Sequence, residues 1–163
     1  MSTTSSGEEL LLPSMYDRLI DLDPGSKTES PKSQGQVLHE LKASLRRDLE
    51  NLLNTRWSCK SWPPDYEELD LSLVNYGIPD FTGISMGGVE NQARLLQIVR
   101  LAIDKFEPRL IKFSVEPVKN TDNIERTLSF RVDGLLQAEP FPEQVVFDTS
   151  LDVHSADFEV KPL

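Results

Sequence analysis

Apolar residues recur at helical spacing over two long stretches of the chain. Over residues 36–54 an apolar side chain returns at about every fourth position, and charged side chains occupy the opposite face. The apolar positions are Val37, Leu38, Leu41, Leu45, Leu49, Leu52 and Leu53. Residues 89–106 show a second stripe with a wider apolar arc. The pattern therefore predicts two long amphipathic helices, of which the second is buried on more than one side.

Beyond the second helix the apolar period changes to that of a β-strand. Pro108 ends the helix, because proline lacks a backbone donor and restricts the residue before it. Apolar and polar residues then alternate around residues 111–115, 128–132, 145–153 and 158–160. Consecutive strands without helices between them indicate an antiparallel meander, with the two helices packed on one face. The predicted fold class is therefore α+β, with a β-meander of about four strands.

The beginning of the chain differs in composition from the rest. Residues 1–9 are mostly Ser, Thr, Gly and Glu, which is typical of a disordered tail. Residues 10–22 predict a short amphipathic helix, and residues 23–35, rich in Pro, Gly, Ser and Lys, predict a flexible linker. Residues 36–163 then form a single α+β domain. The tethered helix either folds back onto this domain or docks into a groove of a partner.

Residues 55–88 combine turn-forming residues with aromatic side chains. The aromatic residues are Trp57, Trp62, Tyr66, Tyr76 and Phe81. This composition is typical of a long loop that is packed by its own side chains, and such loops are often functional.

Charge and composition exclude several function classes. The chain has 163 residues, with 17 Lys and Arg against 27 Asp and Glu, so its formal net charge is −10. A nucleic-acid binder is not expected, because neutralising phosphates requires surplus basic residues. No apolar run reaches the roughly 18–20 residues that span a bilayer, and Glu8 and Glu9 stand where a signal peptide carries positive charge. We therefore expect a cytoplasmic protein that is not inserted in a membrane.

The acidic excess lies in the predicted strand region. Residues 121–163 hold nine acidic and three basic groups, whereas residues 36–120 hold twelve and eleven. The solvent face of the sheet is therefore expected to be acidic. Such a face either discourages pairing between sheet edges or binds a basic partner.

The sequence contains no recognisable metal or catalytic motif. His39 and His154 have neither a nearby cysteine nor a His-x-x-x-His spacing, so we predict no metal site and no cofactor. Cys59 has Lys60 beside it but no base to activate it, which favours a small loop residue over a nucleophile.

Glu107, Pro108 and Arg109 join the second helix to the first strand. The end of the helix accounts for Pro108 but not for the charged residues beside it. These residues either form a local ion pair or offer the guanidinium of Arg109 to a partner carboxylate or carbonyl. A nearby arginine favours the ionised form of Glu107, which is the opposite of what a glycosidase acid needs.

Several motifs follow one another in a recognisable order. They are Ser14, Asp17, Arg18 and Leu19; Ser-Leu-Arg-Arg-Asp-Leu-Glu-Asn-Leu-Leu-Asn-Thr-Arg at 44–56; Asn75, Tyr76, Gly77, Ile78, Pro79 and Asp80; and Glu107, Pro108 and Arg109. This order closely resembles the TssE family of type VI secretion system baseplate proteins, which is related to phage tail baseplate-wedge proteins. The resemblance covers nearly the whole chain after the first ten residues.

The resemblance implies a structural role without catalysis. It implies a baseplate docked at the inner face of the cell envelope, a wedge complex with TssF and TssG, and further contacts with TssK and the sheath proteins TssB and TssC. It also implies a sheath-like surface on which contractile sheath assembly starts. Glu107, Pro108 and Arg109 are the family's contact towards the wedge, and residues 75–80 are a secondary family motif.

Two other functions remain as alternatives. The wider family bears a "lysozyme-like" label, so a peptidoglycan hydrolase is one of them, and an adaptor unconnected with secretion is the other. A sheath-like role would suit an antiparallel sheet whose open edge accepts or lends a strand. We expect that edge at residues 158–160 and at an exposed Val146.

Overall fold

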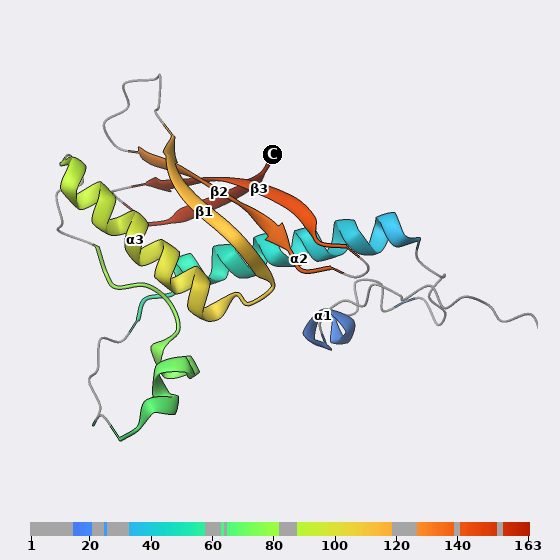
Figure 1. Cartoon of the computed structure of the whole chain (residues 1–163), viewed down its shortest axis with the longest axis horizontal. Helices are drawn as coiled ribbons and strands as arrows, with labels where there is room; N and C mark the ends of the chain where they lie inside the picture. Colours follow the sequence, from blue (N-terminus) through green and yellow to red (C-terminus); the bar gives the residue numbers. More distant parts are fainter. Residues whose placement is uncertain are drawn as a thin grey trace, which may run out of the picture.

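Two long helices pack against one face of an antiparallel sheet in the computed structural model (Figure 1). The structure describes residues 15–20, 25, 33–57, 63, 65–81, 88–118, 127–138, 141–152 and 155–163. The helices are α1 (Met15–Leu19), α2 (Gln34–Asn54) and α3 (Val89–Phe106), with short 3-10 helices η1 (Glu67–Leu71) and η2 (Leu73–Asn75). The strands are β1 (Leu110–Val118), β2 (Thr127–Leu136), β3 (Glu143–Asp152) and β4 (Phe158–Pro162).

The predicted fold class is confirmed. Among the described residues, four strands form one sheet in the order β1-β2-β3-β4, and each neighbouring pair is antiparallel. The sheet is therefore the expected meander.

The helix bounds agree with the prediction for α3 and differ at the start of α2. α2 begins at Gln34, two residues earlier than expected, because Ser33 caps it: the Gln36 N–H donates to Ser33 Oγ, and Ser33 N–H donates to Gln36 Oε1 at 2.8 Å. α1 lies within the predicted residues 10–22, of which residues 10–14, 21 and 22 lie outside the described residues. Residues 1–9, most of the predicted linker, Cys59, Trp62 and His154 lie outside the described residues.

One hydrophobic core joins the helices, the sheet and part of the loop before α3. Its most deeply buried members are Leu45, Leu49, Leu52, Leu53, Ile78, Leu95, Val99, Ile103, Phe130, Leu136, Phe147 and Leu151. Buried and half-buried positions alternate along β2 and β3, so one face of the sheet covers this core. α3 buries one stripe only, and Leu101 is 60% exposed, so the predicted burial on more than one side is wrong.

β4 lies at the edge of the sheet as predicted, but α2 closes that edge. The Asn54 side chain donates to the Phe158 carbonyl oxygen at 2.9 Å and accepts from the Phe158 N–H at 2.8 Å. Arg46 Nη1 donates to the Val160 carbonyl oxygen at 3.2 Å. Val146 is half-buried on β3, and its carbonyl oxygen accepts from the Leu163 N–H. The expectation of an open edge at these positions is therefore wrong.

Replacing Asn54 with alanine should lower the free energy of unfolding by about 2 kcal/mol, as measured by urea denaturation. The variant loses two hydrogen bonds and leaves the N–H and C=O of buried Phe158 without their partners. Asn51→Ala is the matched control, because Asn51 is exposed one turn earlier on α2. Equal stabilities of the two variants would contradict the role of Asn54 in holding β4.

Candidate functional site

The turn between α3 and β1 holds a bidentate ion pair. Glu107 caps the end of α3, and its carbonyl oxygen accepts from the Leu110 N–H at 3.1 Å, so the turn around Pro108 is closed by a backbone hydrogen bond. Arg109 Nε donates to Glu107 Oε1 at 2.6 Å, and Arg109 Nη2 donates to Glu107 Oε2 at 2.7 Å. The side chain of Glu107 is only 6% exposed, whereas Pro108 lies exposed at the tip of the turn. The local ion pair foreseen from the sequence is present.

α2 supplies further partners to the same guanidinium. Arg109 Nη2 also donates to Asp48 Oδ2 at 2.7 Å, and Arg109 Nη1 donates to Ser44 Oγ at 3.3 Å. These two α2 residues lie one turn apart, so they present their oxygens side by side. The hydrogen bonds with Glu107 raise the pKa of Arg109 above its ordinary value, although burial opposes this. Arg109 is therefore a permanently charged link between α2 and the turn.

α1 attaches to this cluster through polar contacts. Arg47 Nη2 donates to Asp17 Oδ1 at 2.6 Å, and Ser44 Oγ donates to Asp17 Oδ2 at 2.7 Å. The Arg47 guanidinium also lies over the Tyr16 ring, 5.6 Å from its centroid. The helix thus folds back onto the domain, but Leu19 on α1 stays 82% exposed.

We call these residues the Arg109 cluster: Asp17, Ser44, Arg47, Asp48, Glu107 and Arg109. The sequence identified Glu107 and Arg109 as candidates, whereas the part that Asp48 and Ser44 play was missed. Asp48 lies 61 residues before Arg109, and no local pattern connects the two. The one available signal was that Ser44, Arg47 and Asp48 lie in the 44–56 motif.

The 75–80 motif joins the long loop to the end of α2. Ile78 is fully buried; its N–H donates to the Thr55 carbonyl oxygen at 3.0 Å, and its own carbonyl oxygen accepts from the Trp57 N–H at 2.9 Å. Gly77 adopts a φ of +107°, a conformation that favours glycine. The motif therefore has a structural role in fixing the path of this loop.

Tyr76 connects the 75–80 motif to the Arg109 cluster. Its ring meets that of Phe106 edge to face, with centroids 5.3 Å apart. Burial raises the pKa of Tyr76, and the nearby carboxylates of Asp48 and Glu107 raise it further. The two motifs thus meet at the end of α3.

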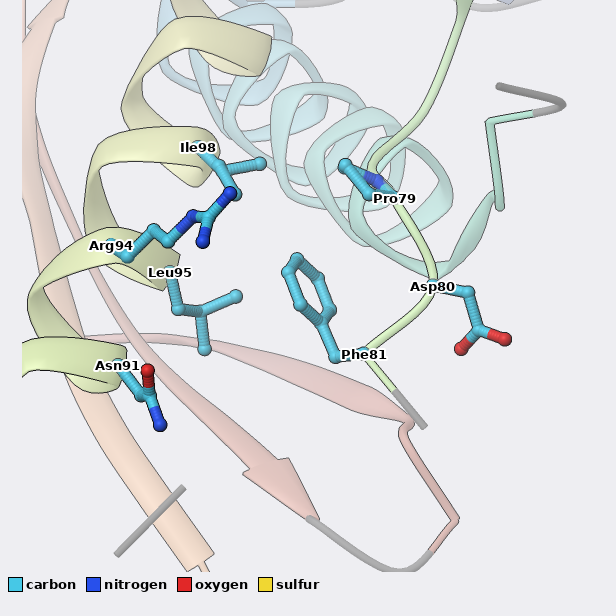
Figure 2. A pocket seen from close by; sticks show the side chains of 7 residues that line it. All are labelled: Pro79, Asp80, Phe81, Asn91, Arg94, Leu95 and Ile98. Atoms are coloured by element: carbon cyan, nitrogen blue, oxygen red, sulfur yellow. The ribbon is translucent and has the colours of Figure 1, made fainter. Parts of the chain in front are cut away.

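The last residues of the motif line a separate small cavity of about 160 Å³ (Figure 2). Its lining consists of Pro79, Asp80, Phe81, Asn91, Arg94, Leu95 and Ile98. The Phe81 ring points toward Leu95 of α3, while the Asp80 carboxylate points away from the helix (Figure 2). The cavity is largely apolar and brings no pair of catalytic groups together.

Comparison with protein families matches residues 39–140 to the baseplate wedge protein gp25. The match covers more than half of the chain, from within α2 to beyond β2, and it includes both motifs described above. The chain belongs to the gp25 family of baseplate wedge proteins. Comparisons with curated proteins and with solved structures give no match. The predicted relationship to phage-type baseplate wedge proteins is thereby confirmed, and the family gives the chain a structural role in a baseplate.

The geometry of the Arg109 cluster in this gp25-family chain does not suit the acid of a glycosidase. A glycosidase acid must carry a proton, but both carboxylate oxygens of Glu107 accept hydrogen bonds from Arg109. Asp48 is held by the same guanidinium, so it does not form a separate acid–base partner. Within the described ranges, no group of three or more His, Cys, Asp or Glu side chains could hold a metal ion. No helix in the described part of the chain is long and apolar enough to cross a membrane.

Proposed function

We propose that the chain is a non-enzymatic component of a type VI secretion system baseplate. It joins a wedge with TssF and TssG in the cytoplasm and presents a sheath-like surface from which sheath assembly starts. The observation that carries this proposal is the gp25-family match over residues 39–140. The motif order that resembles TssE favours a secretion system within this wider family. TssK and the sheath proteins TssB and TssC are then further partners.

The Arg109 cluster supports a contact at the turn around Pro108. The ion pairs of Arg109 with Glu107 and Asp48 fix this turn against α2, and Pro108 projects from it into solvent. Because the turn is already ordered, a partner that binds it loses little conformational entropy. The local ion pair and a partner contact are thus compatible, because the ion pair fixes the turn to which the partner binds.

Replacing Pro108 with glutamate should abolish co-purification with TssF and TssG, with at least a tenfold loss of affinity (about 1.4 kcal/mol). The substitution puts a larger charged side chain at the tip of the turn and removes no hydrogen-bond donor, since proline has none. We expect stability within about 1 kcal/mol of the wild type, since the position is exposed.

Pro63→Glu is the matched control, because Pro63 is also an exposed proline and lies in a different loop. It should co-purify like the wild type. A folded wild-type chain that does not co-purify with TssF and TssG would contradict the wedge function. Unchanged binding by Pro108→Glu would contradict only the contact at this turn.

A further inference from the structure

Residues 65–75, which we call the 65–75 arm, project from the body of the domain. The arm contains η1 and η2, drawn in green, and extends away from α3 and the sheet (Figure 1). The two short helices pack mainly on each other. None of the described core residues comes from this arm. The arm therefore contributes little to the core, and its side chains are available to a partner.

The arm is ordered by its own hydrogen bonds. The Ser72 N–H donates to the Leu69 carbonyl oxygen at 3.2 Å, and Ser72 Oγ donates to the same oxygen at 2.8 Å. Asn75 Nδ2 donates to the Asp70 carbonyl oxygen at 3.1 Å, so it links η2 to η1. A partner that binds this preformed arm loses little conformational entropy.

Large apolar side chains of the arm are exposed. Leu73 is 86% exposed and Leu71 is 67% exposed, and Tyr66 and Val74 are exposed as well. Single exposed apolar residues are normal on a protein surface, whereas several gathered on one projecting segment mark an interaction site. The arm therefore presents an apolar surface that a partner can bury.

The charge of the arm is entirely acidic. Residues 65–75 contain Asp65, Glu67, Glu68 and Asp70 but no Lys or Arg. Asp65, Glu68 and Asp70 are exposed, and their carboxylates form no ion pair within the described residues. A surface that receives the arm must therefore place basic side chains around an apolar floor. An anionic lipid surface, or a second copy of this chain with its net charge of −10, would repel the same carboxylates.

The base of the arm lies beside the turn that carries Pro108. Tyr76, the residue directly after the arm, packs on Phe106 with ring centroids 5.3 Å apart. Phe106 is the last residue of α3 and directly precedes Glu107. One partner can therefore contact both the turn and the arm, which favours the wedge proteins as the partner of the arm.

We propose that the 65–75 arm inserts into an apolar groove of the TssF–TssG complex whose rim carries Lys or Arg side chains. Leu71 and Leu73 enter the groove, and the carboxylates of Glu68 and Asp70 pair with the basic rim. The inference rests on the proposed wedge function and adds a second contact to the one at Pro108.

The first test measures the affinity of full-length variants for the purified TssF–TssG complex. Leu73→Ala shortens the most exposed of the apolar side chains of the arm, and we expect its affinity to fall about tenfold. Leu101→Ala is the matched control, because Leu101 is an exposed leucine on α3, and it should bind like the wild type. Thermal unfolding should show both variants to be about as stable as the wild type, since both side chains are exposed.

The second test reverses charges on the arm. The double variant Glu68→Lys with Asp70→Lys should weaken binding about tenfold at low salt, and the loss should be smaller at high salt because salt screens the charges. Glu90→Lys with Asp104→Lys makes the same change in net charge at exposed positions of α3 and should bind like the wild type. The comparison separates the charges of the arm from the net charge of the chain.

Unchanged binding by Leu73→Ala and by the Glu68–Asp70 variant would overturn the inference alone. A clear loss of stability by Leu73→Ala would also overturn it, because the chain itself would then cover this side chain. Binding of the wild type to phosphatidylglycerol vesicles, or a dimer in light scattering, that is lost in Leu73→Ala would assign the arm to a membrane or to a second copy instead. A folded wild-type chain that does not bind the TssF–TssG complex overturns both the inference and the wedge function.

Discussion

Replacing Arg109 with alanine is expected to lower the free energy of unfolding by about 3–5 kcal/mol. The variant leaves the carboxylate of Glu107, which is almost fully buried, without the cation that binds both of its oxygens. It also removes the hydrogen bonds that join Arg109 to Asp48 and Ser44 of α2. Urea denaturation of the purified chain at neutral pH measures the change.

Comparing the double variant Glu107→Ala with Arg109→Ala to the two single variants isolates the contribution of this ion pair to stability. Removing both charges leaves no buried Glu107 carboxylate to be compensated, so the double variant should lose clearly less stability than the sum of the two single variants. We expect a coupling energy of about 2 kcal/mol between the two positions. A loss below 1 kcal/mol for Arg109→Ala alone, or additive losses, would show that the pair does not stabilise the turn.

This expected loss changes how the wedge contact has to be tested. An Arg109→Ala chain that fails to bind TssF and TssG could fail because its turn is no longer ordered. Pro108 has no hydrogen-bond donor and lies exposed on the same turn, so its substitution alters the surface while keeping the ion pairs. The substitution of Pro108 thus tests binding, and Arg109→Ala tests stability.

The fold class could be predicted from the sequence because it follows from the local spacing of apolar residues. The apolar spacing of α2 and α3 and the alternation along β1 to β4 report which side of each element is buried. Residue-level contacts between distant elements leave no such periodic signal. Asn54 appears in the sequence as one polar residue near a helix end, and only the folded chain reveals that it occupies both backbone groups of Phe158.

The candidate site was predictable in part for the same reason. Glu107 and Arg109 are two residues apart, so their ion pair is a local inference, whereas Asp48 reaches Arg109 through the packing of α2 beside the turn. α1 shows the limit of the apolar pattern itself. Its apolar stripe left open whether the helix folds back or binds a partner; Met15 is 81% exposed, and the contacts that attach α1 are made by Asp17 and Tyr16.

Replacing Gly77 with alanine is expected to lower the free energy of unfolding by about 3 kcal/mol or more. Gly77 adopts a φ of +107°, which side chains disfavour, and an added Cβ would overlap the Thr55 carbonyl oxygen. That oxygen accepts the Ile78 N–H, so relieving the overlap breaks one of the hydrogen bonds that fix the loop to α2. Since the neighbouring Tyr76 packs on Phe106, the disturbance should extend to the end of α3.

Gly35→Ala is the matched control for this glycine. Gly35 lies in the first turn of α2 with no atom within 4 Å of an added Cβ, so alanine should raise stability there by about 0.5–1 kcal/mol. Thermal unfolding of the two variants beside the wild type should therefore show shifts of opposite sign. A Gly77→Ala chain as stable as the wild type would mean that the 75–80 motif does not fix the loop. The 75–80 motif would then need a binding role instead, for which the half-buried Pro79 and the exposed Asp80, at the cavity beside α3, are the candidates.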